Sequence, residues 1–420
     1  MFRAADRHRD QTMNQRGIPM KHRLFIIVFM LLSAVLVSGC WDRSELQDLN
    51  LVSAIGIDAG GDDVENRYLV TVQIVNVGKI AAQGQGGKTE GTPVTIFSDT
   101  GSTIGEAFRK ISPKTPNQLF FPHVQLMMIG EELARNKGIQ DLFDWLERDS
   151  QFRNLFPILI VRNNTAKNAL QITTSLEAIP SANIVSRLKT QKENWGEYAN
   201  IRADQVIQQL GGEGVYISGI QITGDPEKGN SLKNVNQISP QTAMEIKGLA
   251  IFKKGKLIRW LNGKEARGTL RINNELSTTI VNLNCEKKKM GIAVDVSGSK
   301  AKIVAEIKND KPIFHIRVRS EGHISEVHCP IDLSKHKTIE MLQEQLAKEI
   351  KEEIMMSIKA AQEQNNDIFR FGEYINRVDQ KLWKKMKKEW NEEIFPETEV
   401  NVNVKALIRR TGLKTKPYIK

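Results

Sequence analysis

The chain has 420 residues, of which 40% are hydrophobic, and it carries a net charge of +11. This length allows two or three domains with a sizeable buried core. Three cysteines are too few for a disulfide-rich scaffold. Basic residues gather at 381–388 and 409–420, and such surfaces are attracted to anionic bilayers. Nucleic acid is the other usual partner of a basic surface, and the export signal described next argues against it.

An apolar run at 24–37 lies between a basic segment, Lys21-His22-Arg23, and the sequence Leu36-Val37-Ser38-Gly39-Cys40. The run has about 14 residues, which fits the apolar part of a signal peptide and falls short of the roughly 20 that span a bilayer. Small residues followed by cysteine have the form of a bacterial lipoprotein signal. We therefore predict that residues 1–39 are a cleaved signal peptide and that Cys40 carries acyl chains.

Met20 directly precedes the basic segment, so translation from Met20 would give a compact signal. Residues 1–19 are therefore interpreted as an overlong start. The alternatives to cleavage are an uncut signal anchor and an ordinary buried helix. With Cys40 acylated, residues 41–46 are interpreted as a tether beside the lipid, in which Trp41 suits a membrane interface and the charges suit solvent or a partner subunit.

The first region, 40–223, combines strand and helix patterns and is expected to have a mixed α+β fold, possibly as two domains. A glycine-rich polar loop is expected at 81–93 and a helical part in the middle of the region. Strands are predicted at 51–58, 68–77, 94–97, 125–129, 156–161 and 215–222, and helices at 102–111, 138–147, 165–170, 179–190 and 203–210.

Segment 224–241 is rich in Gly, Asp, Pro, Asn and Ser and has the composition of a linker, so we expect a domain boundary there. The remainder, 242–420, is predicted to be a C-terminal α+β domain. A hairpin is expected around Gly255, and further strands are expected at 276–285, 292–296, 301–307, 313–319 and 400–408.

The longest helical pattern in the chain runs over 338–362, and its apolar residues recur every three or four positions. We expect this stripe to pack across an antiparallel sheet, with shorter helices at 368–375 and 378–390. The predicted fold class is therefore α+β and multi-domain, with mixed sheets and packed helices. The C-terminal domain is expected to combine an antiparallel sheet with a long amphipathic helix.

Three histidines, His315, His323 and His328, lie near Glu326 and Cys329 and form the only candidate metal cluster in the sequence. His323 and His328 are five residues apart, which places them on opposite faces of a strand. No zinc-binding spacing is present. We predict no metal and no cofactor, and interpret these residues as a solvated sheet face and turn.

Catalytic motifs are also not found. Gly84, Gly86 and Gly87 superficially resemble a phosphate loop, but a strand follows them where such a loop needs a helix. The paired carboxylates Glu131-Glu132 and Glu352-Glu353 are expected on exposed helix faces. We predict that the protein is not an enzyme.

Cys285 and Cys329 lie in or near predicted strands. They could pair across a sheet, but two separate buried thiols are the favoured interpretation.

Short motifs extend from the predicted lipidation site to the last strand. They are CWDRSEL at 40–46, AIGID at 54–58, HVQL at 123–126, IGEELA at 129–134, Arg148-Asp149, GLAIFKKGKL at 248–257, WLN at 260–262, DIFRFGEY at 367–374, Leu382-Trp383, Trp390, IFP at 394–396 and the segment 400–412. Together, and in this order, they resemble the Ger(x)C family, the lipoprotein C subunits of the germinant receptors of endospore-forming bacteria. Arg259 departs from the pattern, because members often have a small residue such as glycine there, and this affects only a local turn or packing detail.

The resemblance implies a non-enzymatic protein of three mixed α/β domains, anchored by lipid at Cys40 to the outer face of the spore inner membrane. It implies a role in nutrient-triggered germination with two membrane-embedded partners, the A and B subunits. One of these would be a larger multi-span subunit with a soluble domain, and the other would resemble an amino-acid transporter. The family offers no catalytic, cofactor or metal residues to carry over.

Two other interpretations fit the sequence less well. A solute-binding lipoprotein that serves a transporter would need a cleft between two similar lobes, whereas this chain has dissimilar halves. An exported enzyme acting on the cell wall would need a catalytic motif, and none is recognised.

Overall fold

The computed structural model describes residues 49–84, 91–191, 196–210, 214–285 and 288–410, together with Met20, Lys21 and Phe25. The chain divides into two compact units, Met1–Leu49 and Asn50–Lys420. All helices and strands discussed below belong to the second unit, apart from the first residue of strand β1.

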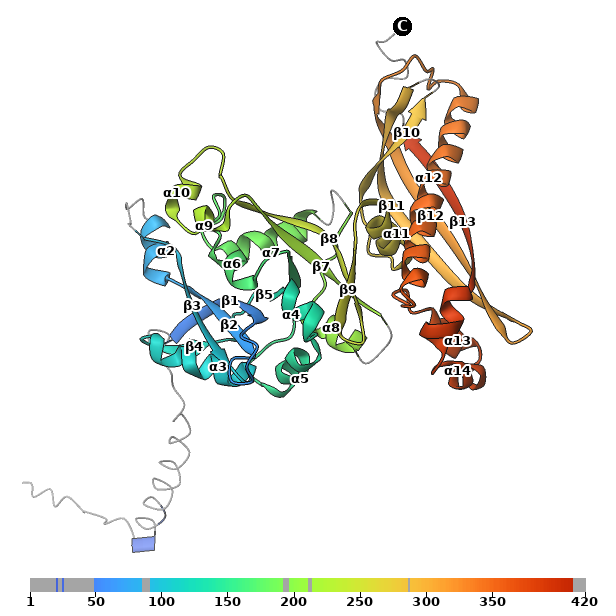
Figure 1. Ribbon diagram of the computed structural model, residues 1–420. Helices are drawn as coiled ribbons and strands as arrows, with labels where there is room; N and C mark the ends of the chain where they lie inside the picture. Colours follow the sequence, from blue (N-terminus) through green and yellow to red (C-terminus); the bar gives the residue numbers. More distant parts are fainter. Residues whose placement is uncertain are drawn as a thin grey trace, which may run out of the picture. The chain divides into compact units, whose positions relative to one another are not determined.

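The strands follow the predicted order closely, and several are longer than predicted (Figure 1). They are β1 (Leu49–Ala59), β2 (Tyr68–Val75), β3 (Val94–Gly101), β4 (Gln118–Phe120), β5 (Leu126–Gly130), β6 (Ile158–Arg162), β7 (Val215–Thr223), β8 (Ala243–Lys253), β9 (Lys256–Leu261), β10 (Thr279–Cys285), β11 (Lys288–Lys308), β12 (Lys311–Val327) and β13 (Glu399–Arg410).

The helices cover the faces of two sheets. They are α2 (Val77–Gly84), α3 (Ile104–Ile111), α4 (Glu131–Asn136), α5 (Gln140–Arg148), α6 (Ala166–Gln171), α7 (Pro180–Gln191), α8 (Ala203–Leu210), α9 (Pro226–Gly229), α10 (Leu232–Val235), α11 (Gly263–Ile272), α12 (His336–Glu363), α13 (Phe371–Val378) and α14 (Gln380–Met386). The expected glycine-rich loop is corrected in part, since α2 continues to Gly84; residues 85–90 lie outside the described part of the chain.

The first sheet is mixed and has nine strands in the described part of the chain, in the order β3-β2-β1-β5-β6-β7-β8-β9, with β4 paired to β1. Neighbours β1, β5, β6 and β7 are parallel, and the remaining pairs on this path are antiparallel. Successive side chains of a strand point to opposite faces. On β1, Ala54 accordingly packs with α6 and α7, whereas Ile55 and Ile57 belong to the core that includes α3 and α5. Because the central strands are buried on both faces, their sequences are nearly continuous runs of apolar residues.

Segment 224–241, where a linker and a domain boundary are expected, joins two neighbouring strands of one sheet. The strands on either side of it, β7 and β8, pair with each other in antiparallel register from Val215↔Phe252 to Thr223↔Ala243. Within the segment, α9 and α10 pack against the first sheet region, and the main-chain N–H of Thr173 donates to the carbonyl oxygen of Gly229 at 2.9 Å. The polar composition therefore marks a long connection inside one sheet. The first sheet ends with β9.

The second sheet has the order β10-β11-β12-β13. Its strands β10, β11 and β12 are antiparallel, as predicted. Strands β12 and β13 are parallel, so the antiparallel sheet expected here is corrected to a mixed one at this edge. The predicted strands at 292–296 and 301–307 are parts of the single 21-residue strand β11. Burial alternates along β12, which leaves one face for a helix and one for solvent.

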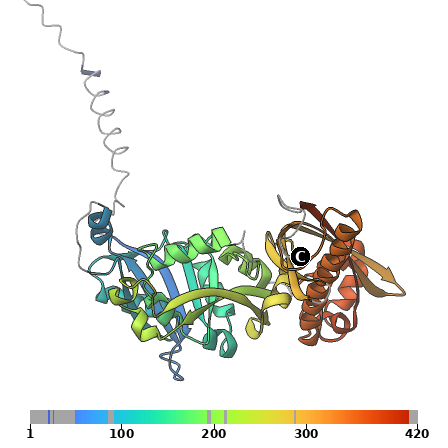
Figure 2. The same ribbon diagram turned by 90° about the horizontal axis from the view of Figure 1, so that it is seen from above.

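Helix α12 confirms the longest predicted helix and covers the buried face of the second sheet (Figures 1 and 2). Its apolar stripe, from Leu342 to Ile358, is buried with Phe314 and Ile316 of β12. Trp390 is fully buried, and the half-buried ring of Trp383 lies edge-on to it, with ring centres 5.7 Å apart. These aromatic side chains close one end of the core.

Cys285 and Cys329 form a disulfide, which corrects the interpretation as separate thiols. Cys285 ends β10, and Cys329 follows β12. Strand β11 lies between β10 and β12 in the sheet. The bond therefore ties β10 to the segment that leaves β12, on the far side of β11.

Candidate functional site

Cys40, the predicted lipid attachment site, lies outside the described residues, as do residues 41–46 and nearly all of the predicted signal peptide. Two of the other sequence motifs meet in space. The AIGID motif lies at the end of β1. The IGEELA motif begins with the last two residues of β5 and continues into α4. Strands β1 and β5 pair in parallel register, with Ile57 beside Ile129. The residues that follow, Asp58 and Gly130, therefore emerge at the same edge of the sheet.

Asp58 is almost completely buried and caps helix α6. Its carboxylate oxygens accept hydrogen bonds from the main-chain N–H groups of Ala166 at 2.6 Å and Lys167 at 2.9 Å. A carboxylate at a helix N-terminus satisfies amides that have no partner within the helix and interacts favourably with the helix dipole. Gly130 provides the room, because a Cβ there would overlap an oxygen of Asp58.

Glu131 begins α4 beside this cap and is buried, which corrects the expectation that it is exposed; its neighbour Glu132 is exposed as predicted. The Glu131 carboxylate accepts from the indole N–H of Trp260 at 2.9 Å, the main-chain N–H of Asn163 at 2.7 Å and Nε of Arg135 at 2.8 Å. These donors come from β9, the end of β6 and α4. We call Asp58, Gly130, Glu131 and Trp260 the strand-end cluster.

Electrostatics differ between the two acids of the strand-end cluster. Burial raises the pKa of Asp58 to about 6 and outweighs the two amide donors. Burial also works to raise the pKa of Glu131, but the hydrogen bonds from Trp260, Asn163 and Arg135 outweigh it and hold that pKa below its usual value. The hydrogen bonds of these two acids thus connect the ends of β1, β5, β6 and β9.

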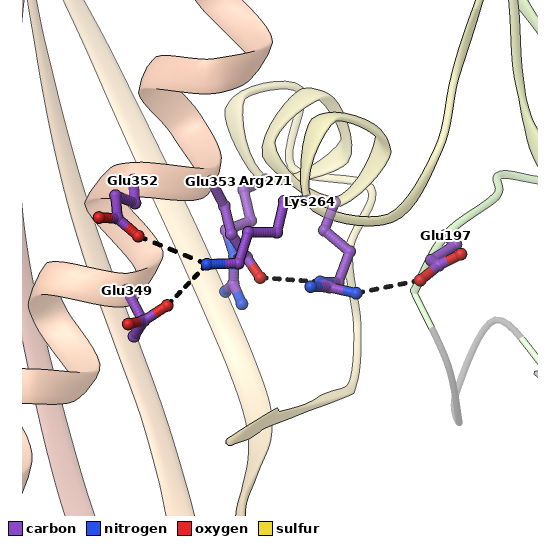
Figure 3. A network of polar contacts seen from close by, with 7 residues as sticks. Glu197, Lys264, Arg271, Glu349, Glu352 and Glu353 are labelled. Carbon is purple, nitrogen blue, oxygen red and sulfur yellow. Dashed lines mark hydrogen bonds and ion pairs between the residues drawn. The ribbon is translucent and has the colours of Figure 1, made fainter. Parts of the chain in front are cut away.

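A second polar cluster links α11 to α12 (Figure 3). Nε of Arg267 donates to Glu353 at 2.8 Å, and a terminal nitrogen of the same guanidinium donates to Glu197 at 3.0 Å. Nε of Arg271 donates to the other oxygen of Glu353 at 3.1 Å. We call Glu197, Arg267, Arg271 and Glu353 the α11–α12 network. It ties the connection before α8 to α11 and α12.

Burial distinguishes the two acids that were predicted together on α12. Glu353 is only 1% exposed, which overturns the expected exposure, whereas Glu352 is exposed and pairs with Lys264 at 3.4 Å. Arg271 is 0% exposed, and burial lowers the pKa of its guanidinium despite Glu353. Its two terminal nitrogens have no hydrogen-bond partner within the described chain. Glu353 is therefore the counter-charge that makes burial of Arg271 tolerable.

The DIFRFGEY motif forms the turn into α13 around the buried Asp367. The Asp367 carboxylate accepts from the indole N–H of Trp390 at 2.9 Å and from the main-chain N–H groups of Gly372 at 2.9 Å and Phe369 at 3.1 Å. Burial raises the pKa of this carboxyl. Gly372 is required by close approach, since a Cβ there would overlap the ring of Trp383.

The three histidines do not converge. His315 lies 2.8 Å from Glu306, His323 lies 3.4 Å from Asp295, and His328 lies 2.8 Å from Glu326. Among the described residues, no group of three or more His, Cys, Asp and Glu side chains could hold a metal ion.

The basic segment at 381–388 is displayed on and after α14, where its lysines are exposed. Of the basic end, Arg409 pairs with Glu321 at 2.8 Å, and residues 411–420 lie outside the described part of the chain. None of the described helices is both long enough and apolar enough to cross a bilayer.

Arg259, which departs from the family pattern, is accommodated without breaking β9. Its guanidinium pairs with Glu265 at 2.6 Å and with Glu363 at 3.2 Å. Sequence reasoning missed α11 and both of its network arginines. Their spacing of four residues, beside the apolar pair Ala266 and Leu270, was the available signal for a helix with one buried face.

Family models match two long segments of the chain. The spore germination protein N-terminal domain covers residues 42–222, and the domain described as spore germination B3/GerAC like, C-terminal covers residues 247–412. The chain is 34% identical to spore germination protein KC of Bacillus subtilis (strain 168), over 95% of this chain and 98% of that protein. It is 23% identical to spore germination protein B3 of the same organism, over 92% and 97% of the two chains.

The fold also has a counterpart among solved structures. The crystal structure of the GerBC protein superimposes with a TM-score of 0.53, covering 84% of this chain and 96% of that one at 19% identity. This likeness supports the mixed α+β architecture. The two family models and the relatives matched over nearly their full length lead to one conclusion: the chain belongs to the Ger(x)C family of spore germination proteins.

Proposed function

We propose that this protein is the lipid-anchored, non-enzymatic C subunit of a spore germinant receptor. The observation that carries the proposal is the match to spore germination protein KC over 95% of the chain, joined to the lipoprotein signal that ends at Cys40. In this role Cys40 would be acylated at the outer face of the spore inner membrane. The folded part would assemble with the membrane-embedded A and B subunits.

The buried acids support a structural role over catalysis. Asp58, Glu131, Glu353 and Asp367 each accept hydrogen bonds from main-chain or side-chain donors that hold elements together. A general acid or base must instead be able to exchange its proton with a substrate.

Anchoring needs more than one contact, because a single acyl chain binds a bilayer weakly. A second acyl chain on Cys40 would strengthen the attachment. The exposed lysines of 381–388 could add attraction to anionic lipid or to a partner subunit.

The solute-binding alternative is not favoured. It requires two similar lobes around a cleft, whereas the two sheets here differ in strand number and order.

Germination of spores that lack this chain tests the proposed role. The response to amino acids, sugars and nucleosides should be lost for one nutrient class and return when the wild-type chain is restored. Membrane levels of the A and B subunits, followed in the same spores, show whether the chain is needed for their assembly. An unchanged response to every nutrient, with no related subunit present in the strain, would contradict the receptor role.

A further inference from the structure

The outer face of the second sheet carries a group of cationic side chains from three neighbouring strands, β11, β12 and β13 (Figure 1). They are Lys300, Lys302, Arg317, Arg319 and Lys405. All five are exposed and lie on the face opposite to α12, because they alternate along their strands with the buried residues that pack against this helix. We call these five residues the basic face. None of them belongs to the strand-end cluster or to the α11–α12 network.

The strand register places the charges of the basic face directly opposite one another. Lys302 lies opposite Arg317, and Lys300 lies opposite Arg319. On its other side, Arg319 lies opposite Lys405. Neighbouring strands are about 4.8 Å apart, and alternate residues of one strand are about 7 Å apart. The five main-chain positions therefore fall within an area of about 10 Å by 7 Å.

Acids of the chain leave most of this charge unneutralised. Four of the five side chains have no ion pair within the described part of the chain, and the exception is Arg319, at 3.4 Å from Glu321. Glu321 lies closer to Arg409, at 2.8 Å. Like charges directly opposite each other destabilise a sheet. The fold alone therefore gives no reason for this arrangement, whereas an anionic partner does.

A hollow of about 510 Å³ adjoins the basic face. Its lining includes Arg317, Asn403 of β13 and Lys351 of α12, and no acid of the described chain. Its volume is within the range of sites that hold small molecules or headgroups. Guanidinium and ammonium groups donate strong hydrogen bonds to phosphate oxygens. The hollow therefore suits a phosphate group.

The composition of the basic face distinguishes a lipid surface from a protein partner. The centres of protein interfaces are enriched in aromatic residues and depleted of lysine. The basic face has three lysines, and its three strands place no Phe, Tyr or Trp side chain beside them. Phe314, the one such residue on these strands, is buried on the other face. These features favour attraction to anionic lipid, which needs charge alone.

We propose that the basic face docks on an anionic lipid bilayer, with a phosphate headgroup in the adjoining hollow. This inference rests on the proposed function, because acylation at Cys40 would hold the chain beside a bilayer. Salt screens attraction of this kind. Docking would fix the second sheet against the membrane surface, in addition to the anchor.

Lysine reactivity on vesicles tests the docking. The full chain is purified from membranes and reconstituted on vesicles of phosphatidylcholine alone or with added phosphatidylglycerol, and its lysines are acetylated and quantified by mass spectrometry. Lys300, Lys302 and Lys405 should react about threefold more slowly, or less, on the anionic vesicles. About 0.5 M sodium chloride should abolish this protection. Lys189, exposed on α7, is the reference and should react equally on both kinds of vesicle.

The two kinds of vesicle separate the anchor from the docking. A chain that does not associate with neutral vesicles would contradict the lipid anchor. A chain that associates with both kinds but shows no protection of the three lysines would overturn the docking, as would equal protection of Lys189. Protection that appears only when the A and B subunits are added would assign the basic face to a protein partner and overturn the lipid assignment.

A charge variant with a matched control locates the contact. Lys302→Gln with Arg319→Gln should remove most of the protection of Lys405 on anionic vesicles. This variant should unfold at no lower temperature than the wild type, because it relieves repulsion between opposite positions. Lys228→Gln with Lys233→Gln removes the same charge from exposed positions on α9 and α10 and should leave the protection unchanged. Equal protection of Lys405 in the two variants would overturn the assignment.

Discussion

Gly130 leaves the space that the carboxylate of Asp58 occupies, because a Cβ at position 130 would overlap Oδ1 of Asp58. The two residues lie 72 positions apart in the sequence, at the ends of the neighbouring parallel strands β1 and β5. The absent side chain lets the Asp58 carboxylate reach the amides of α6. Two motifs that are separate in sequence therefore form one structural unit.

Gly130→Ala should destabilise the protein by about 1–3 kcal/mol, since the added methyl group displaces Asp58 and leaves buried amides without their acceptor. Urea unfolding measures the change. Gly78→Ala is the matched control, because Gly78 is exposed on α2 and a Cβ there meets nothing within 4 Å. Equal stability of the two variants would show that Gly130 is not needed for the cap.

Asp58 should make stability depend on pH. Its pKa is about 6 in the folded chain, whereas the ordinary pKa of an exposed aspartate is 3.8. The folded state therefore binds this proton more tightly than the unfolded chain does. The contribution of this group to stability is complete below about pH 4, falls as pH rises to about 6, and is constant above that. A pKa raised by about two corresponds to about 3 kcal/mol.

Asp58→Asn removes this titration, so unfolding free energies of the two proteins should be compared at a series of pH values. The wild type should lose about 2–3 kcal/mol relative to the variant between pH 4 and 6.5. Parallel curves for the two proteins across this range would contradict the raised pKa.

Glu353→Gln should destabilise the protein by roughly 3–5 kcal/mol, because it leaves the fully buried Arg271 without its counter-charge. The neighbouring Glu352→Gln is the control. Glu352 forms an exposed pair with Lys264, and exposed pairs contribute little. Thermal unfolding of both variants distinguishes the two positions, and a similar effect of the two substitutions would refute the buried network.

The disulfide should contribute measurably to stability. It joins residues 44 positions apart, and closing a loop of this length corresponds to about 4 kcal/mol in the chain-entropy account. The double variant Cys285→Ala with Cys329→Ala should therefore unfold at a lower temperature than the oxidised wild type. Dithiothreitol should lower Tm of the wild type and leave that of the variant unchanged. A wild-type Tm insensitive to reductant would argue against the bond.

Hydrophobic periodicity predicted the long helix well, because the stripe from Leu342 to Ile358 depends only on local spacing. Helix α11 escaped prediction because its buried side includes the charged Arg271. Burial of Arg271 is possible only through Glu353, which is distant in the chain. Single-sequence patterns do not reveal such a partner.

Two other features of the structure were not visible in the sequence patterns, for different reasons. The parallel pairing of β12 and β13 was available in principle, since a helical crossover of the kind formed by α12 to α14 allows parallel strands to pair. The polar segment 224–241 was interpreted as a linker from composition alone. Composition does not show that the strands on both sides of a segment pair with each other.

Of the candidate site, sequence motifs identified the right segments but not their roles. Asp58, Gly130 and Asp367 all lie in motifs quoted for the family resemblance, yet their contacts arise only when distant strands and turns meet. The disulfide is a similar case, because Cys285 and Cys329 come together only through the register of β10, β11 and β12.

The most direct test of the proposed receptor role compares spores that carry the wild-type chain with spores that carry Cys40→Ala. The membrane content of the chain and the nutrient response are measured in the same spores. We predict that the variant is folded but lost from the membrane fraction and that germination is impaired. A variant that remains in the membrane at the normal level and supports a normal nutrient response would contradict the lipid-anchored subunit proposed here.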